Sequence, residues 1–241
     1  MPVAIKYGIV RGVSSDAMRI EEFKKRVIKW YEAHGDKDLP WRRARDGWAV
    51  LVATFLLKKT TTKQVVKIYE AFLQRFPTPQ ALLPASEDDV RRIIMPLGME
   101  HQRAKLLKEL AKVLTERFKG RVPCNREELK KLPGVGEYIA SEVLLRICGQ
   151  PEVLLDRNMI RVIERVFGVK SAKKRPHTDP KLWSFARELV PKNPEEAEKF
   201  NFGVLDFARK VCTARNPSCT ECFVKDLCQA FENHAYEQGT K

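Results

Sequence analysis

The chain of 241 residues contains no long hydrophobic segment. Its longest apolar run, residues 48–57, is interrupted by Thr54 and is far shorter than the roughly 20 residues that a membrane-spanning helix needs. The first residues also lack the pattern of a signal peptide. We therefore expect a cytoplasmic protein that has no contact with a membrane. Because disulfides are rare in that compartment, its cysteines are expected to bind metal rather than to pair.

Sustained strand alternation is also missing, as are internal repeats and low-complexity tracts. Apolar residues recur at helical spacing instead, which predicts an all-α fold. Residues 39–43 contain a proline and are expected to form an extended linker, and residues 1–16 show no clear period. The expected helices cover Met18–Trp30, Gly47–Lys58, Thr61–Phe76, Glu87–Met95, Gln102–Phe118, residues 126–130, a segment after Gly136, Asp156–Phe167 and Lys181–Leu189.

Acidic residues are too few to balance the basic ones. The 45 Lys and Arg residues exceed the 31 Asp and Glu residues, which gives a net charge of +14 and a pI near 9.6. Such an excess favours a polyanionic partner. A basic surface that is simply solvated is the alternative.

One stretch carries the clearest signal for such a partner. Leu132, Pro133, Gly134, Val135 and Gly136 form a turn between two expected helices, the first of which Asn125 and Glu128 would open as a capping box. Proline ends a helix, and glycine leaves the backbone bare. The free amides at the start of the second helix would then bind phosphate without reading sequence. An ordinary helix–turn–helix corner is the alternative.

Four cysteines near the C-terminus indicate a metal centre. Cys212, Cys219, Cys222 and Cys228 have the spacing C-x6-C-x2-C-x5-C, and both zinc and a [4Fe–4S] cluster accept four thiolates. The spacing alone leaves these two open. The two other cysteines, Cys124 and Cys148, are expected to be unpaired core or surface thiols.

Taken together, these features resemble the helix-hairpin-helix DNA glycosylases, the superfamily of endonuclease III and MutY. The resemblance runs from about Phe23 to Cys228 and rests on residues 39–41, 132–136, Asp156, 201–207 and the cysteine spacing. Within the superfamily, the thymine-DNA mismatch (MIG-type) branch is most similar, through residues 56–61, 101–104, 120–123 and 136–138.

The resemblance implies two helical lobes with the hairpin at the cleft between them. A six-helix barrel would span residues 40–150. An N-terminal helix, residues 17–39, would join residues 151–231 to form the second lobe. This lobe would carry a [4Fe–4S] cluster in the loop 212–228.

The resemblance also implies the chemistry. Asp156 matches the family's catalytic aspartate, which stabilises positive charge on the sugar or orients a water; a helix cap is its structural alternative. Tyr138 stands where bifunctional relatives carry the lysine that forms a Schiff base, so the enzyme is expected to be monofunctional and to leave an abasic site. Packing on the cleft wall is the alternative for Tyr138.

The base pocket is expected to include Thr54 and Trp41. Thr54 departs from the family pattern, because MutY-type enzymes place a glutamate there to protonate adenine. Adenine excision by that route is therefore not expected. Thymine and uracil leave more readily as anions and need less help from an acid.

Several further residues are expected to contact DNA. Lys59, Met99 and His101 match loops that fill the space left by a flipped base, although a solvent-facing loop is the alternative. Arg157 and the hairpin residues Leu132, Gly134, Val135 and Gly136 complete the set. A monovalent cation at the hairpin, a monomeric state and association with the nucleoid are further expectations.

The function expected from these features is removal of thymine or uracil from G·T and G·U mismatches by base flipping, without strand cleavage. The first alternative is a glycosylase of the same fold for an oxidised base or for adenine opposite 8-oxoguanine. The second is a non-catalytic DNA-binding module, and a redox protein built on the cluster is a weaker reading.

Overall fold

A computed structural model describes residues 13–238 of the chain. Of residues 1–16, for which the sequence shows no clear period, 1–12 lie outside this range and 13–16 begin the first helix. No strand occurs in the described part, which confirms the all-α prediction. The longer elements are α1 (Val13–His34), α3 (Gly47–Leu57), α4 (Thr62–Arg75), α6 (Glu87–Ile94), α7 (Glu100–Phe118), α9 (Glu137–Arg146), α10 (Arg157–Phe167), α11 (Pro180–Leu189), α12 (Pro194–Lys210) and α13 (Gln229–Gln238). The shorter ones are α2 (Pro40–Arg43), α5 (Pro79–Leu82), α8 (Arg126–Lys130) and the 3-10 turns η1 (Met95–Leu97), η2 (Pro176–Thr178), η3 (Cys219–Glu221) and η4 (Lys225–Leu227).

Some expected elements differ from the observed ones. The linker expected at residues 39–43 is wrong, because α2 forms a single helical turn there. Leu39 is extended, as a residue before proline prefers, and Pro40 then starts the turn with its fixed φ. The first helix begins at Val13, five positions before Met18. Helices α5, α12 and α13 were not expected. None of the described helices has the length and apolarity to span a bilayer.

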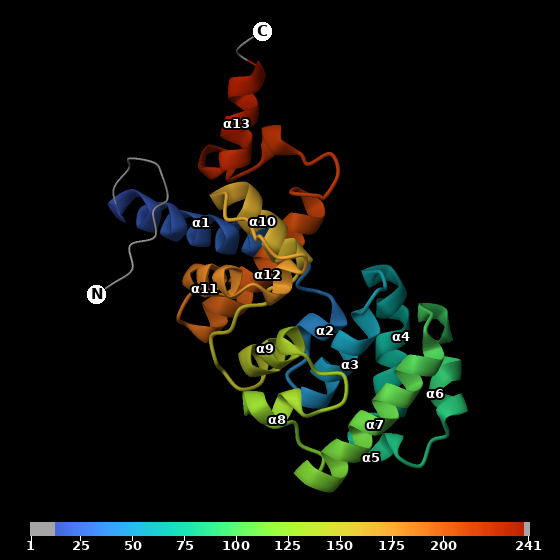
Figure 1. The fold of residues 1–241 in the computed structure, drawn as a ribbon. Coiled ribbons are helices and arrows are strands. Elements are labelled where there is room, and N and C mark those ends of the chain that lie inside the picture. Colours follow the sequence, from blue (N-terminus) through green and yellow to red (C-terminus); the bar gives the residue numbers. More distant parts are fainter. Residues whose placement is uncertain (1–12, 239–241) are drawn as a thin grey trace.

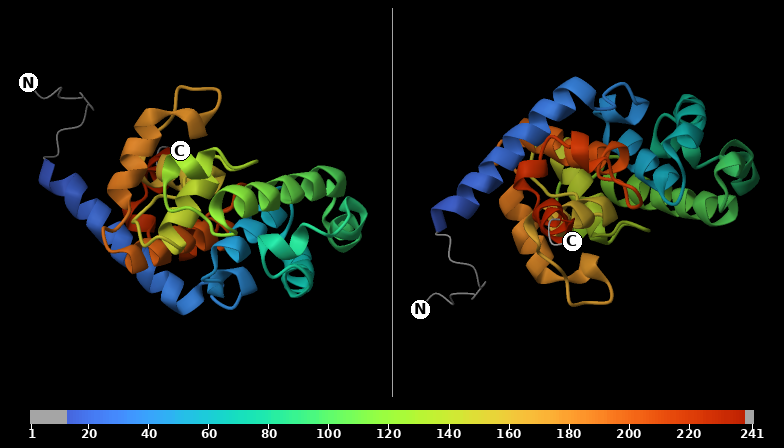
Figure 2. Two further views of the ribbon diagram at one scale, coloured as in Figure 1. Left: turned by 90° about the horizontal axis from the view of Figure 1, so that it is seen from below. Right: turned by 90° about the horizontal axis from the view of Figure 1, so that it is seen from above.

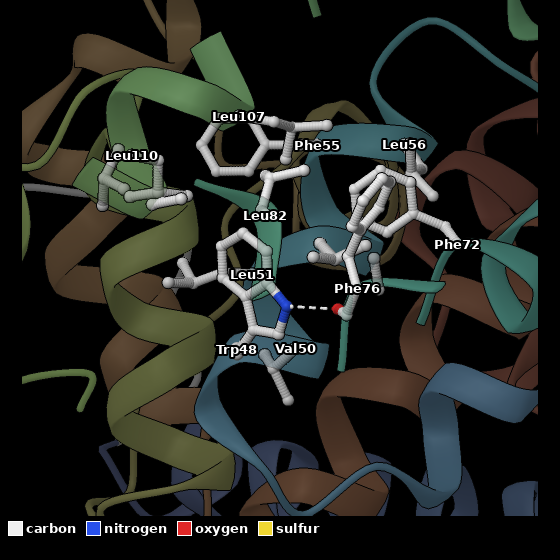
Figure 3. Packing of buried hydrophobic residues seen from close by; sticks show 14 of the residues in the cluster. Trp48, Val50, Leu51, Phe55, Leu56, Phe72, Phe76, Leu82, Leu107 and Leu110 are labelled. Carbon is white, nitrogen blue, oxygen red and sulfur yellow. Dashed lines mark hydrogen bonds between the residues drawn. The ribbon is translucent and has the colours of Figure 1, made fainter. Parts of the chain in front are cut away.

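The first hydrophobic core is built around α3, which is buried along nearly its whole length. The ring nitrogen of Trp48 donates a hydrogen bond of 3.0 Å to the carbonyl oxygen of Phe76, so the indole is satisfied inside the core (Figure 3). Helices α4, α7 and α9 contact α3, and α6 packs against α4 and α7 to extend this core.

The second hydrophobic core joins the N-terminal helix to the C-terminal half of the chain. Helix α1 lies along α12 and also contacts α11, and all three appear together in Figures 1 and 2. Phe23 is fully buried there and meets the rings of Phe167 and Phe200 edge-on. Helix α9 contributes to both cores: Val143 and Leu144 belong to the first, whereas Leu145 belongs to the second. The lobe boundaries expected at residues 40–150 and 151–231 remain a prediction.

Cys124 and Cys148 form a disulfide, so the expectation of two unpaired thiols is wrong. Their Cα atoms lie 5.6 Å apart although 24 positions separate them in the sequence. Cys124 precedes α8 and Cys148 follows α9, and these two helices pack against each other. The antiparallel hairpin therefore brings its two outer ends within disulfide distance, which the sequence spacing could not reveal.

This disulfide is predicted to stabilise the fold. Closing a loop of this length is expected to raise the free energy of unfolding by about 3–4 kcal/mol, which for a chain of this size corresponds to roughly 10 °C in Tm. The Cys124→Ala/Cys148→Ala variant should therefore melt at a lower temperature by calorimetry without reductant. The wild-type protein in its reduced form should have the same Tm as the variant. Equal Tm values for oxidised wild type and variant would contradict a stabilising role.

Candidate functional site

A cleft of ≈ 1510 Å³ lies between elements of the two cores. The end of α3, the turn between α8 and α9, and the cleft-facing side of α9 line one part of it. The start of α10, η2 and α11 line the other part. Six of the predicted site residues line this cleft: Thr54, Gly134, Gly136, Tyr138, Asp156 and Arg157.

Asp156 caps α10 and also lines the cleft, so the helix cap does not exclude the catalytic role that is expected of this residue. One carboxylate oxygen accepts hydrogen bonds of 2.8 Å from the backbone amides of Asn158 and Met159. The other accepts one of 2.8 Å from the side-chain amide of Asn158. Burial raises the pKa of Asp156, while these hydrogen bonds and the charge of Arg161 lower it. The carboxylate is thus held in one orientation at the cleft wall.

Tyr138 is half-buried in the first turn of α9. Burial raises the pKa of its phenol well above the usual value, and the charges of Glu142 and Asp156 raise it further. The phenol therefore stays neutral at physiological pH. It can donate a hydrogen bond into the cleft, but it has no amine with which to form a Schiff base.

The two residues expected in the base pocket have different positions. Thr54 lines the cleft at 8% exposure, and its hydroxyl donates a hydrogen bond of 2.7 Å to the carbonyl of Leu51 within α3. Trp41 is not part of the cleft lining. Its ring lies in the first core and meets Tyr69 edge-on at 5.8 Å, because the α2 turn directs it inward.

The hairpin turn has the bare backbone that the sequence predicts. Gly134 has a φ of +74°, and a Cβ added there would lie 2.7 Å from the ring of Phe55. Gly136 is the N-cap residue of α9. A Cβ added there would meet nothing within 4 Å, so the space in front of the helix N-terminus is open. Leu132 and Val135 are buried in the first core. Their side chains anchor the turn, which leaves only their backbone for a DNA contact.

The capping box expected before the hairpin forms only in part. Asn125 accepts a hydrogen bond from the amide of Glu128, but no return bond from Glu128 closes the box. Glu137, at the start of α9, is instead paired with Arg126 at 2.8 Å and with Lys130. The hydrogen bond from Lys130 and then that from Arg126 lower the pKa of Glu137. Glu137 therefore stays ionised, and two basic side chains balance its negative charge beside the N-terminus of α9.

The two expected insertion loops lie outside the cleft lining and are joined by one buried arginine. Lys59 and Met99 both have positive φ, 60° and 54°, and Met99 and His101 are exposed. Arg103 donates to the carbonyls of Phe55, Leu56 and Lys58 at the end of α3, and to that of Gly98 at 3.0 Å. One guanidinium thus satisfies the carbonyls that precede both loops.

Sequence reasoning missed part of the cleft. Glu142 lines it and is only 6% exposed. It stands four positions after Tyr138, so helical spacing places it on the same face of α9, and that spacing could have revealed it. The far wall, with His177 and Trp183, comes from η2 and α11. No sequence signal linked that segment to the hairpin.

The four cysteines of the loop 212–228 are unpaired. Burial raises the pKa of Cys222 to about 11, and the other three thiols add to this effect by their proximity. A bound metal centre, by its positive charge, would favour the ionised form of these four buried thiols. Four thiols gathered in one loop fit a centre that takes four sulfur ligands, which both zinc and an iron–sulfur cluster do.

Two family models match the chain. Residues 212–228 match the iron-sulfur binding domain of endonuclease III, in agreement with the chemistry of the four thiols, and the chain carries an iron–sulfur cluster there. Residues 52–188 match the HhH-GPD superfamily base excision DNA repair protein.

Similar proteins span the same length. A thymine-DNA glycosylase of Aeropyrum pernix is 64% identical over 218 residues, which cover 90% of this chain and 98% of the relative. A thymine/uracil-DNA glycosylase of Pyrobaculum aerophilum is 65% identical over 201 residues, covering 83% and 87%. The solved structure of a thermostable thymine-DNA glycosylase has a TM-score of 0.85 at 32% identity, covering 91% of this chain and 99% of the other. With its hairpin, its cleft and its cysteine loop, the chain belongs to the HhH-GPD superfamily of base excision DNA repair proteins.

Proposed function

We propose that the protein is a monofunctional DNA glycosylase that removes thymine or uracil from G·T and G·U mismatches. One observation carries this proposal: a carboxylate in a fixed orientation, Asp156, and a neutral phenol, Tyr138, line the same cleft beside the open hairpin. The names of the Aeropyrum and Pyrobaculum relatives support the same substrate class. We further propose that the protein acts as a monomer associated with the nucleoid.

In the proposed reaction a mispaired pyrimidine leaves the stack and enters the cleft, at a cost that is smallest for a mispair. As the bond between C1′ and N1 breaks, positive charge develops on the sugar. The Asp156 carboxylate, held by three hydrogen bonds, stabilises that charge or orients the attacking water. Tyr138 offers no amine, so the product is an abasic site and the strand stays intact.

The DNA would be held by two kinds of contact. The open backbone at Gly136 and the side chain of Arg157 would bind phosphates next to the cleft. Lys59 and the loop from Met99 to His101 would fill the space left by the flipped base. A monovalent cation at the hairpin, which would add to the phosphate contact, is part of the same proposal.

The iron–sulfur centre is proposed to be a [4Fe–4S] cluster held by the four thiolates. When bound, it would supply a fixed structural centre for the loop rather than chemistry in the cleft. Arg165 donates to the carbonyl of Thr213 at 2.7 Å and approaches the sulfur of Cys212 at 3.4 Å, so α10 is tied to this loop. Basic residues at the end of α12 and in the loop would then face DNA, with Arg209, Lys210, Arg215 and Lys225 as candidates.

The adenine alternative is disfavoured by one observation. Thr54 occupies the cleft wall where that route needs a carboxylic acid, and its hydroxyl is already bonded to Leu51. In a non-catalytic DNA-binding module, Asp156 would serve only as the cap of α10.

A panel of labelled duplexes tests the substrate and the reaction type together. We expect release of free thymine from G·T and of uracil from G·U, with strand breaks only after alkali. Duplexes with A·8-oxoguanine or an oxidised pyrimidine serve as comparison substrates. Intact G·T and G·U duplexes would overturn the proposal, and strand breaks without alkali would overturn its monofunctional part.

The Asp156→Asn variant is expected to lose at least 10²-fold in single-turnover excision, the scale of losing one electrostatic stabiliser of the transition state. Its Tm should not fall, because asparagine caps helices as well as aspartate does. In the wild type the rate should rise with pH through the Asp156 pKa, which burial raises, because the ionised form is the active one. Unchanged excision by the variant would favour the non-catalytic alternative.

The Cys222→Ser variant tests the metal centre. Loss of one thiolate should remove the visible absorption of anaerobically purified protein, lower the Tm and weaken duplex affinity, because cluster binding and folding are coupled. Iron and sulfide analysis of the wild type should give equal amounts, four of each per chain. The finding of zinc instead of iron would contradict the proposed cluster.

A further inference from the structure

A second carboxyl group in the cleft has no role in the mechanism above. Glu142 lies one helical turn after Tyr138 on the face of α9 that lines the cleft, and only 6% of its surface is exposed. Its one hydrogen bond among the described residues comes from the Arg146 guanidinium, 3.2 Å from one carboxylate oxygen. By contrast, Asp156 receives three. Glu142 therefore has hydrogen-bonding capacity to spare beside the place where a flipped base would lie.

The charges around Glu142 come from three elements. On α9 itself, Arg146 is the direct partner and Tyr138 is the neutral neighbour. The α2 turn contributes the charge of Arg42, and α12 contributes Glu198. Arg146 is shared: its Nη2 atom donates to the carbonyls of Trp41, Arg42 and Ala44, and its Nε atom lies 3.7 Å from Glu198. Because this arginine has other partners, it does not require Glu142 to be ionised.

We propose that Glu142 is the general acid of the cleft, a catalytic residue that gives its proton to the departing pyrimidine. This inference rests on the proposed function. The bond between C1′ and N1 breaks with both electrons going to the pyrimidine, which takes the carboxyl proton of Glu142. Water adds its oxygen to C1′ and gives one proton to the Asp156 carboxylate. Solvent then returns that proton and restores both carboxyl groups, so that the sum is base release by one water.

The environment of Glu142 suits this role. Burial raises the pKa of Glu142 above the usual value, while Arg146 and Arg42 lower it in part. The acid is therefore protonated over a wider pH range than an exposed glutamate. Thr54 also lines the cleft, but its hydroxyl already donates to the carbonyl of Leu51. Of these two residues, only Glu142 has a carboxyl proton to give to the base.

The test compares Glu142→Gln with the matched control Glu198→Gln. Each variant removes one carboxylate next to Arg146, but Glu198 is not part of the cleft lining. We expect Glu142→Gln to lower single-turnover excision of uracil from a G·U duplex by about 10²-fold, the low end of the roughly 10²–10⁴-fold supplied by acid–base catalysis. It should also abolish the fall in rate that the wild type shows as pH rises through the Glu142 pKa. Glu198→Gln should retain the wild-type rate and profile.

A binding measurement separates this inference from the proposed function. A duplex with 2′-fluoro-thymidine opposite guanine resists cleavage, and a duplex with an abasic analogue carries no base. The ratio of wild-type affinities for these two should fall as pH rises, whereas for Glu142→Gln it should not change. That result would support contact between Glu142 and the base even if no duplex were cleaved, in which case only the proposed function would fail.

The opposite results would overturn the inference. If Glu142→Gln and Glu198→Gln gave the same rates and pH profiles, Glu142 would be only a buried partner of Arg146. If the affinity ratio of the wild type did not depend on pH, Glu142 would not contact the base. Melting curves of both variants establish that a loss of rate does not come from unfolding.

Discussion

The guanidinium of Arg146 is fully buried where the two hydrophobic cores meet, and a charge in such a place must be paired. It binds the carbonyls of three residues in the segment from Trp41 to Ala44, and it also binds Glu142. One side chain therefore joins the chain segment between the cores to the helix that carries Tyr138. These bonds tie α9 to the α2 turn, since breaking any of them would leave a buried polar group unsatisfied.

Asp156 and Glu142, two of the carboxyl groups that line the cleft, have different surroundings. Asp156 lies at the positive end of α10 and accepts three hydrogen bonds, all of which favour its ionised form. Glu142 lies within a helix and accepts one. Burial raises the pKa of both, but only Asp156 has several donors that oppose the rise. Such a difference between two nearby acids is how one site holds a base and an acid at the same pH.

Much of the fold could be predicted from local patterns. Helical spacing located α4, α6, α7 and α10 to within a few residues, because each buries one face, and the apolar run of α3 located that helix, which is buried on all sides. The hairpin and the cysteine loop were also evident, since glycine, proline and cysteine have few alternative uses at such spacing. Asp156 is predicted to be catalytic, with a helix cap as the structural alternative, and its hydrogen bonds show the cap directly.

Tertiary contacts explain what the sequence could not predict. The disulfide depends on the packing of α8 against α9, which brings together residues 24 positions apart. Trp41 belongs to a motif of the family, but whether its ring faces the cleft or the core depends on the turn that α2 makes. Likewise, the contribution of His177 and Trp183 to the cleft comes from the path of the chain after α10, for which no local pattern exists.

The bonds of Arg103 have a mechanical consequence. Because one planar guanidinium holds the carbonyls before both Lys59 and Met99, it constrains the distance between these two loops. If both loops enter DNA as proposed, the protein and not the ligand would set the spacing between them. A helix that already bends easily at a weak pair would fit them, whereas a stiff, fully paired one would resist, so that mechanical compliance of the nucleic acid would itself select where the protein stops.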